Sequence, residues 1–152
     1  MFRGVHSVAL DVKGRVMMPA KHRDSIRESS EGRMVVTVDT EERCLLLYPL
    51  PDWNLIQAKI EALPSFNPAA RRIQRLLIGH AADVELDASG RFLIPPPLRD
   101  YANLDKKIVL IGQGKKFEVW NEEQWELKRE EWLAIARSEN GDMPDELKSL
   151  SL

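Results

Sequence analysis

The sequence has very little of several features that define large classes of proteins. It contains one cysteine, Cys44, so no disulfide can form within the chain, as is typical of proteins from a reducing compartment. No apolar run approaches the ~20 residues that a membrane-spanning helix needs. The segment Met1–His6 lacks the apolar core and cleavage site of a signal peptide. We therefore expect a cytoplasmic protein with no membrane partner.

Motifs for catalysis and metal binding are also scarce. The three histidines, His6, His22 and His80, have neither the mutual spacing nor the cysteine neighbours of a zinc site. We find no nucleophile motif, phosphate-binding loop or paired acid/base signature. Cys44 lies in an apolar, strand-like run, which favours a buried structural thiol over a reactive one. The sequence therefore predicts no enzyme activity, metal, cofactor or small-molecule substrate.

What the chain does contain is a repeat. Leu10–Pro19 and Leu86–Pro95 both read Leu-Asp-x-x-Gly-Arg, three residues, then Pro, at an offset of 76 positions. Cys44–Tyr48 and Lys116–Trp120 match at an offset of 72, and each is followed by a tryptophan five residues on. This duplication indicates one supersecondary module built twice. Each half is near the lower size limit for an independent core, so we expect the halves to fold onto each other or onto another chain.

Local patterns place hairpins within each repeat. Val5–Leu10 and Arg15–Met18 flank turn-forming residues and predict a hairpin with a four-residue loop. Met34–Val38 and Cys44–Tyr48 predict a second hairpin. We divide the chain into a first repeat, a connecting helix, a second repeat and an acidic tail, at residues 1–63, 64–79, 80–137 and 138–152.

Charge is distributed unevenly along a chain whose net charge is -2. Residues 1–27 carry a net charge of +4, whereas residues 115–152 carry -4. A basic end suits a polyanion such as DNA, although chance asymmetry on a solvated surface is the plainer alternative. Residues 80–100, around the second copy of the turn, carry -2. On charge, we expect the first repeat to face DNA and the second to support the fold and assembly.

The repeated Asp-x-x-Gly-Arg turn allows two interpretations. In the plainer one, Asp11 pairs with Arg15 across its own turn, as Asp87 does with Arg91, and an exposed pair of this kind contributes ~0–1 kcal/mol. In the functional one, the aspartate holds the planar arginine fork so that the hairpin can present it to phosphates or guanine edges. The motif residues in either case are Asp11, Gly14, Arg15, Asp87, Gly90 and Arg91.

Several motifs together resemble those of the MraZ family, bacterial transcriptional regulators with two SpoVT-AbrB-type modules in one chain. They are the opening Met-Phe-Arg-Gly, the paired turns, the Leu-Leu-Leu-Tyr-Pro run, the Leu-Leu-Ile-Gly-His-Ala segment and the closing Leu-x-x-Leu-Ser-Leu. The resemblance implies an α+β fold of duplicated β-hairpin/helix modules, with a β-barrel-like core and flanking helices. One departure is Ser89, which stands where the first copy has the basic Lys13.

The resemblance also implies a function. Members form homo-oligomeric rings, associate with the nucleoid and bind short direct repeats in promoter DNA. They usually repress their own gene and the division and cell-wall gene cluster. On this basis we expect DNA contacts from Arg3, His6, Lys13, Arg15, Lys21 and Arg91. A non-catalytic oligomerisation or antitoxin-like protein-binding module is the alternative, and it predicts weak, sequence-indifferent DNA binding.

Overall fold

The computed structural model describes residues 1–138 and 144–150, and the chain divides into two units, residues 1–122 and 123–152. The second unit comprises α6 (Asp145–Lys148) and nearly all of α5 (Glu122–Arg137). The first unit contains β1 (Phe2–Ala9), β2 (Arg15–Met17), α1 (Ala20–Ser30), β3 (Arg33–Val38), β4 (Leu45–Pro49), α2 (Leu50–Glu61), α3 (Pro68–Ile73), the π-helix η1 (Gln74–Ile78), β5 (Ala82–Glu85), β6 (Arg91–Leu93), α4 (Pro96–Tyr101), β7 (Lys107–Gly114) and β8 (Phe117–Asn121). None of the helices in the described ranges is long and apolar enough to cross a membrane.

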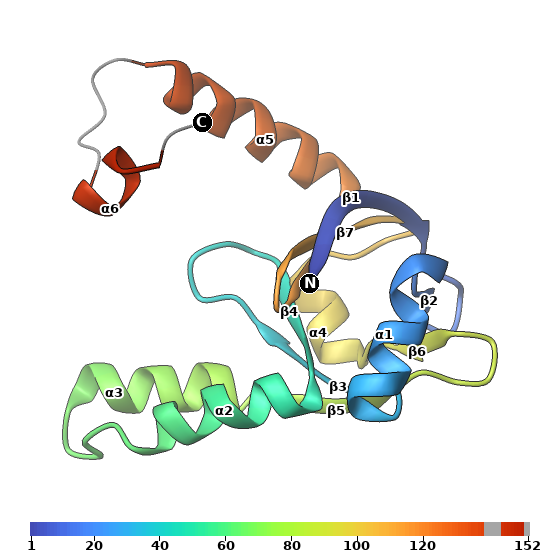
Figure 1. Cartoon of the computed structure of the whole chain (residues 1–152), viewed down its shortest axis with the longest axis horizontal. Helices are drawn as coiled ribbons and strands as arrows, with labels where there is room; N and C mark the ends of the chain where they lie inside the picture. The colour runs from blue at the N-terminus through green and yellow to red at the C-terminus, as the bar shows by residue number, and fades with distance from the viewer. Residues whose placement is uncertain (139–143, 151–152) are drawn as a thin grey trace. The chain divides into compact units, whose positions relative to one another are not determined.

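Six strands form an antiparallel sheet in the order β1-β7-β8-β4-β3-β5 (Figure 1). Among the described residues its edge strands, β1 and β5, do not pair with each other, so the sheet stays open. The predicted α+β class is therefore confirmed, whereas the predicted barrel-like core is not. The reason is that β2 and β6 leave the sheet and pair with each other as a separate two-stranded ribbon.

The β2–β6 ribbon joins equivalent segments of the two repeats. Val16 lies opposite Phe92, and both side chains are buried. Beyond the ribbon, the backbone amide of Met18 donates to the Gly90 carbonyl, and the equivalent amide of Ile94 donates to the carbonyl of Gly14, both at 2.9 Å. Each repeat thus completes hydrogen bonds that the other begins, which confirms that the halves fold onto each other.

One of the two predicted hairpins is wrong. The second forms as expected, with β3 and β4 paired and Val35 opposite Tyr48. In the first, β1 and β2 meet only at an isolated bridge between Leu10 and Val16, and β1 pairs instead with β7 over its whole length. The local turn does close, but its strands diverge because each pairs with a strand of the other repeat.

The sheet carries apolar residues on both faces. Met34 and Val36 of β3 belong to the larger cluster, which includes the buried residues of the ribbon. Val35 between them faces a second cluster, because successive side chains of a strand point to opposite faces. Trp53 of α2 packs in that second cluster. Cys44 is fully buried, as the sequence predicts.

The predicted connecting helix forms in two parts. Asn67 caps α3 as expected, since its side chain accepts hydrogen bonds from two backbone amides of the first turn. The helix then widens into η1, where the amide of Gly79 donates to the Gln74 carbonyl at 3.2 Å. Within this wider turn the carbonyl of Leu77 accepts a hydrogen bond from the buried hydroxyl of Thr37, 2.7 Å away. Pattern alone gives no sign of this partner on β3.

Candidate nucleic-acid interface

The first Asp-x-x-Gly-Arg turn is held closed by Asp11. Its Oδ1 accepts the backbone amides of Lys13 and Arg15 at 2.9 and 2.8 Å, and its Oδ2 accepts the Nε–H of Arg15 at 2.8 Å. These hydrogen bonds, led by the one from the Arg15 backbone, lower the pKa of Asp11 to about 2. Gly14 adopts a φ of +86°, which a glycine tolerates without steric cost. The turn is therefore a fixed structure built by its own sequence.

The second turn repeats this geometry. Asp87 accepts the amides of Ser89 and Arg91, both at 2.9 Å, and the Nε–H of Arg91 at 3.1 Å. Gly90 has a φ of +84°. The pKa of Asp87 is likewise lowered, first by the hydrogen bond from the Arg91 backbone. The aspartate–arginine pairs predicted across each turn are thus confirmed in both copies.

Each pairing engages only part of the arginine. Arg15 and Arg91 each donate the Nε–H to their own aspartate. Among the hydrogen bonds of the described residues, the Nη groups of both arginines have no protein acceptor. Their side chains are about one-third exposed, at 32% and 34%. The two interpretations of the turn are therefore compatible, because an arginine oriented by its aspartate still offers the outer edge of its fork to an acceptor.

The ribbon brings both arginines to one surface. Directly opposite residues of an antiparallel pair share a face, and so do alternate residues of a strand. Arg15 lies opposite Leu93, and Met17 lies opposite Arg91, so these four side chains occupy the outer face of the β2–β6 ribbon. Met17 and Leu93 are 39% and 48% exposed. The charge-based expectation treated the two turns as separate surfaces, and this pairing corrects that premise.

The two repeats also cover each other's turns. Arg99 of α4 lies over Gly14, where an added Cβ would stand 2.5 Å from the arginine Cζ. Arg23 of α1 lies over Gly90, and its Nε–H donates to the carbonyl of Met18 at 2.7 Å. The two arginines are 76 positions apart, the same offset as the turns. Sequence reasoning gave neither of them a role, although this shared offset could have drawn attention to them.

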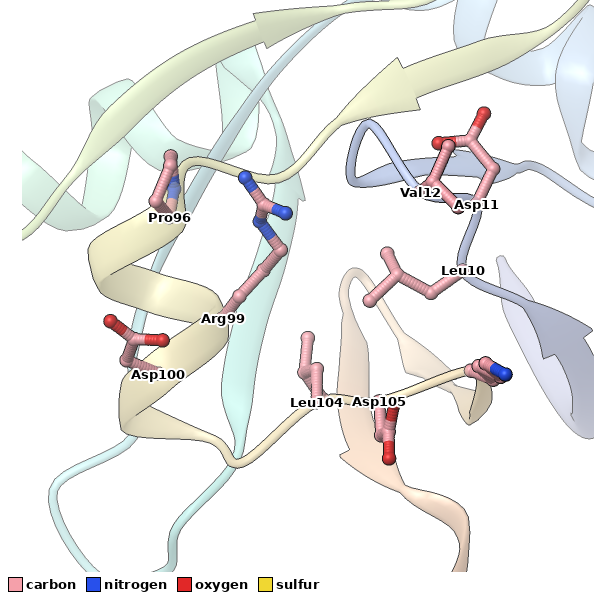
Figure 2. A pocket seen from close by; sticks show the side chains of 9 residues that line it. Leu10, Asp11, Val12, Pro96, Arg99, Asp100, Leu104 and Asp105 are labelled. Carbon is pink, nitrogen blue, oxygen red and sulfur yellow. The ribbon is translucent and has the colours of Figure 1, made fainter.

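A cavity of about 370 Å³ lies beneath the first turn (Figure 2). Figure 2 shows Arg99 extending from α4 toward the segment that carries Asp11 and Val12. The Nε of Arg99 is buried without a hydrogen-bond partner. The lining offers cations, carboxylates and apolar groups but no serine, threonine, cysteine or histidine: Leu10, Asp11, Val12, Pro96, Arg99, Asp100, Leu104, Asp105 and Lys106.

The remaining predicted contacts gather at the start of the chain. Arg3 and Lys21 are exposed, and the His6 Nε2 lies 3.4 Å from the Arg3 carbonyl. The space beside Gly4 is bordered by the His6 ring and by the Lys21 Nζ. His22 was assigned no role from the sequence, but it is buried and stacks edge-on to His6, with ring centroids 5.4 Å apart. Burial, followed by the charges of Lys21 and His6, lowers the pKa of His22.

One group of possible metal ligands lies on the sheet. The ligating atoms of Asp39, Cys44 and Glu118 are within 4.8 Å of one another. The thiol donates to the Asp39 Oδ2 at 3.7 Å, and burial raises the pKa of Cys44 far above its usual range. The Glu118 carboxylate accepts the indole N–H of Trp120 at 2.8 Å. At neutral pH the thiol is therefore protonated, and the side chains of Asp39 and Glu118 are each held by a hydrogen bond. The sequence gives no sign of this group, because Glu118 lies far along the chain from Asp39 and Cys44.

The lowered pKa of Asp11 leads to a prediction about stability. Its folded value of about 2 lies below the ordinary value of 3.8, so the unfolded chain binds the proton more tightly. Its stabilising contribution is therefore present above pH 4 and disappears as pH falls toward 2. We expect Asp11→Asn to lower the urea midpoint at pH 7 and to converge with wild type between pH 4 and 2. Asp24→Asn is the control; a gap between wild type and Asp11→Asn that persists undiminished at pH 2 contradicts the prediction.

Comparisons with known proteins cover the whole length. A family model described as "MraZ protein, putative antitoxin-like" matches residues 1–76 and 77–141. The chain is 58% identical over 152 residues to a protein of Coxiella burnetii (strain RSA 493 / Nine Mile phase I) named "Transcriptional regulator MraZ". Proteins of the same name from Legionella pneumophila (strain Paris) and Halorhodospira halophila (strain DSM 244 / SL1) are 55% and 51% identical. Each alignment covers 100% of both chains.

Proposed function

The chain belongs to the MraZ family, and from this premise we propose that it is a sequence-specific DNA-binding transcriptional regulator that reads DNA with the outer face of the β2–β6 ribbon. The observation that carries the proposal is that Arg15 and Arg91 lie on that single face. The major groove of B-DNA admits a two-stranded β-ribbon. A bidentate arginine is the commonest specific contact to guanine.

The fixed geometry of the turns supports this use. Asp11 and Asp87 hold their arginines through Nε, so each fork is oriented before DNA arrives. A side chain that is already ordered loses less conformational freedom on binding. Arg15 and Arg91 lie diagonally across this face, and Met17 and Leu93 occupy the other diagonal as exposed apolar side chains. The ribbon thus combines directional hydrogen-bond donors with an apolar surface that loses its water at little cost in free energy.

Sequence-independent contacts come from the basic start of the chain. Arg3, Lys13 and Lys21 are exposed, and His6 is partly exposed. Lysine and arginine contacts to phosphates supply most of the non-specific affinity of DNA-binding proteins. We assign these residues to the DNA backbone and the ribbon arginines to base edges.

The finer features of the function follow from the family resemblance. We propose that the chain forms a homo-oligomeric ring on direct repeats in the promoter of its own gene and of the division and cell-wall gene cluster, and represses them. In the cell this places it in the cytoplasm, on the nucleoid. In such a ring, rigid linkage of several ribbons would raise avidity by ~10²–10⁴ where their spacing matches that of the direct repeats.

The second candidate is a protein-binding module, and the "antitoxin-like" description of the family model favours it. In this case the ribbon face would bind a protein, and DNA binding would be weak and indifferent to sequence. Catalysis has less support, because the relatives from Coxiella, Legionella and Halorhodospira are all named transcriptional regulators.

A mobility-shift titration with DNA from upstream of the protein's own gene tests the proposal. The operator is the shortest duplex from that region that retains specific binding. We expect it to be bound at least 10³-fold more tightly than a scrambled duplex at physiological salt. Equal affinity for both duplexes, together with capture of a protein ligand, would favour the second candidate.

The salt dependence of the same titration isolates the phosphate contacts. We expect Lys13→Ala to reduce the slope of log affinity against log salt by about 1, because one cationic contact is lost. Lys59→Ala, an exposed lysine on α2, is the matched control and should leave the slope unchanged. Identical slopes for wild type and Lys13→Ala would remove Lys13 from the interface.

A further inference from the structure

We propose that Val12 determines specificity by contacting the 5-methyl group of a thymine in the operator, an inference that rests on the proposed function. Val12 is the second residue of the first turn, and its side chain is 98% exposed. Among the described residues no other large apolar side chain is as exposed. An apolar group in this position is unexplained by packing within the chain.

The exposure of Val12 does not come from a loose loop. Its neighbours on both sides are tied to each other, since the Lys13 amide donates to the Asp11 Oδ1 and the Gly14 amide donates to the Asp11 carbonyl. The turn is also covered by Arg99 at Gly14. Valine itself is branched at Cβ and therefore stiff at χ1. The turn thus presents a small, rigid apolar group in a fixed place.

Base chemistry limits what such a group can recognise. Of the groups that base edges present in the major groove, the thymine 5-methyl is the apolar one, and apolar side chains contact it in known complexes. Val12 and Arg15 stand in the same hydrogen-bonded turn. A guanine read by Arg15 and a thymine read by Val12 therefore belong to the same short stretch of operator.

The second turn offers an internal comparison. Ala88 occupies the position equivalent to Val12, and Ser89 the position equivalent to Lys13. The hydrogen-bonded geometry of the two turns is the same, so the difference lies in the side chains they present. The first turn carries the larger apolar group, and we assign thymine reading to it alone.

Deoxyuridine substitution tests the contact at the level of one methyl group. Each thymine of the operator is replaced in turn by deoxyuridine, which lacks only the 5-methyl, and affinities are measured for wild type, Val12→Ala and Ala88→Gly. For wild type we expect about a fourfold loss at one thymine in each repeated box, the factor that burial of one methyl group contributes. For Val12→Ala the same substitution should cause no further loss. Ala88→Gly should keep the wild-type pattern.

The possible outcomes separate this inference from the function on which it rests. A flat deoxyuridine scan in a wild-type protein that still prefers operator to scrambled DNA overturns the role of Val12 and leaves the proposed function intact. No preference for operator defeats the proposed function itself. If Val12→Ala binds thymine and deoxyuridine operators equally weakly and sediments as a smaller assembly, Val12 contacts another copy of the chain, and the inference is wrong.

Discussion

Replacement of Arg15 by alanine is expected to abolish discrimination between operator and scrambled DNA while the protein stays folded. The pair with Asp11 is partly exposed, and such pairs contribute ~0–1 kcal/mol to stability. One bidentate contact to a base contributes about 1–3 kcal/mol of discrimination. Every subunit of an assembly would lose the same contact, so the effect multiplies over the repeated boxes.

The matched variants are Arg91→Ala on the same ribbon and Arg33→Ala away from it. Arg91 shares the outer face with Arg15, so its replacement should also weaken operator binding. This expectation differs from the one based on charge, under which Arg91 serves mainly the fold and assembly. Arg33 forms an exposed pair with Glu31, and its replacement should change neither affinity nor stability appreciably. Unchanged operator affinity in a folded Arg15→Ala protein would remove the first turn from the reading surface.

The second large effect is expected from Gly14→Ala, on stability. A residue other than glycine at a φ of +86° is strained by about 1–2 kcal/mol. The new Cβ would also stand 2.5 Å from the Arg99 Cζ, so the flexible end of that side chain must move aside, which adds a smaller loss of stability. We expect a marked fall in the urea midpoint. Gly90→Ala should behave alike, since its Cβ would stand 2.6 Å from the Arg23 Cδ.

Gly32→Ala separates the two causes. Gly32 has a similar φ of +81°, but its Cβ would meet the Leu86 Cβ at 3.5 Å, an ordinary contact. The excess loss in Gly14→Ala over Gly32→Ala therefore measures the contact with Arg99. That excess should disappear in the Gly14→Ala/Arg99→Ala double variant. If Gly14→Ala and Gly32→Ala lose equal stability, the covering of one repeat's turn by the other contributes nothing.

Features that depend on nearby residues could be predicted from the sequence. The Asp11 turn, the β3–β4 hairpin and the Asn67 cap each arise from residues a few positions apart. The family resemblance places the expected DNA contacts on the same turns, which stays a prediction. These elements are correct because turn and cap chemistry is local.

Features that depend on which strands pair with each other could not be predicted. Val16 can bury itself against a neighbour in its own hairpin or against Phe92, and the apolar pattern is the same in both cases. Hydrophobic periodicity identifies a strand but not the strand with which it pairs. The pairing of β2 with β6 therefore appears only in the structure. The same is true of its consequence, that Arg15 and Arg91 lie on one face.

Site-specific crosslinking measures directly whether the outer face of the β2–β6 ribbon lies against DNA. In Leu93→Cys, a thiol-reactive photocrosslinker attached to the new cysteine lies on that face. The native Cys44 does not compete for the label, because its side chain is fully buried. The comparison is Phe66→Cys, at an 87% exposed position in the segment between α2 and α3. If the ribbon reads DNA, we expect that operator DNA crosslinks at position 93, that unlabelled operator suppresses the crosslink, and that position 66 stays unreactive. Crosslinking at position 66 with none at position 93 would contradict this expectation.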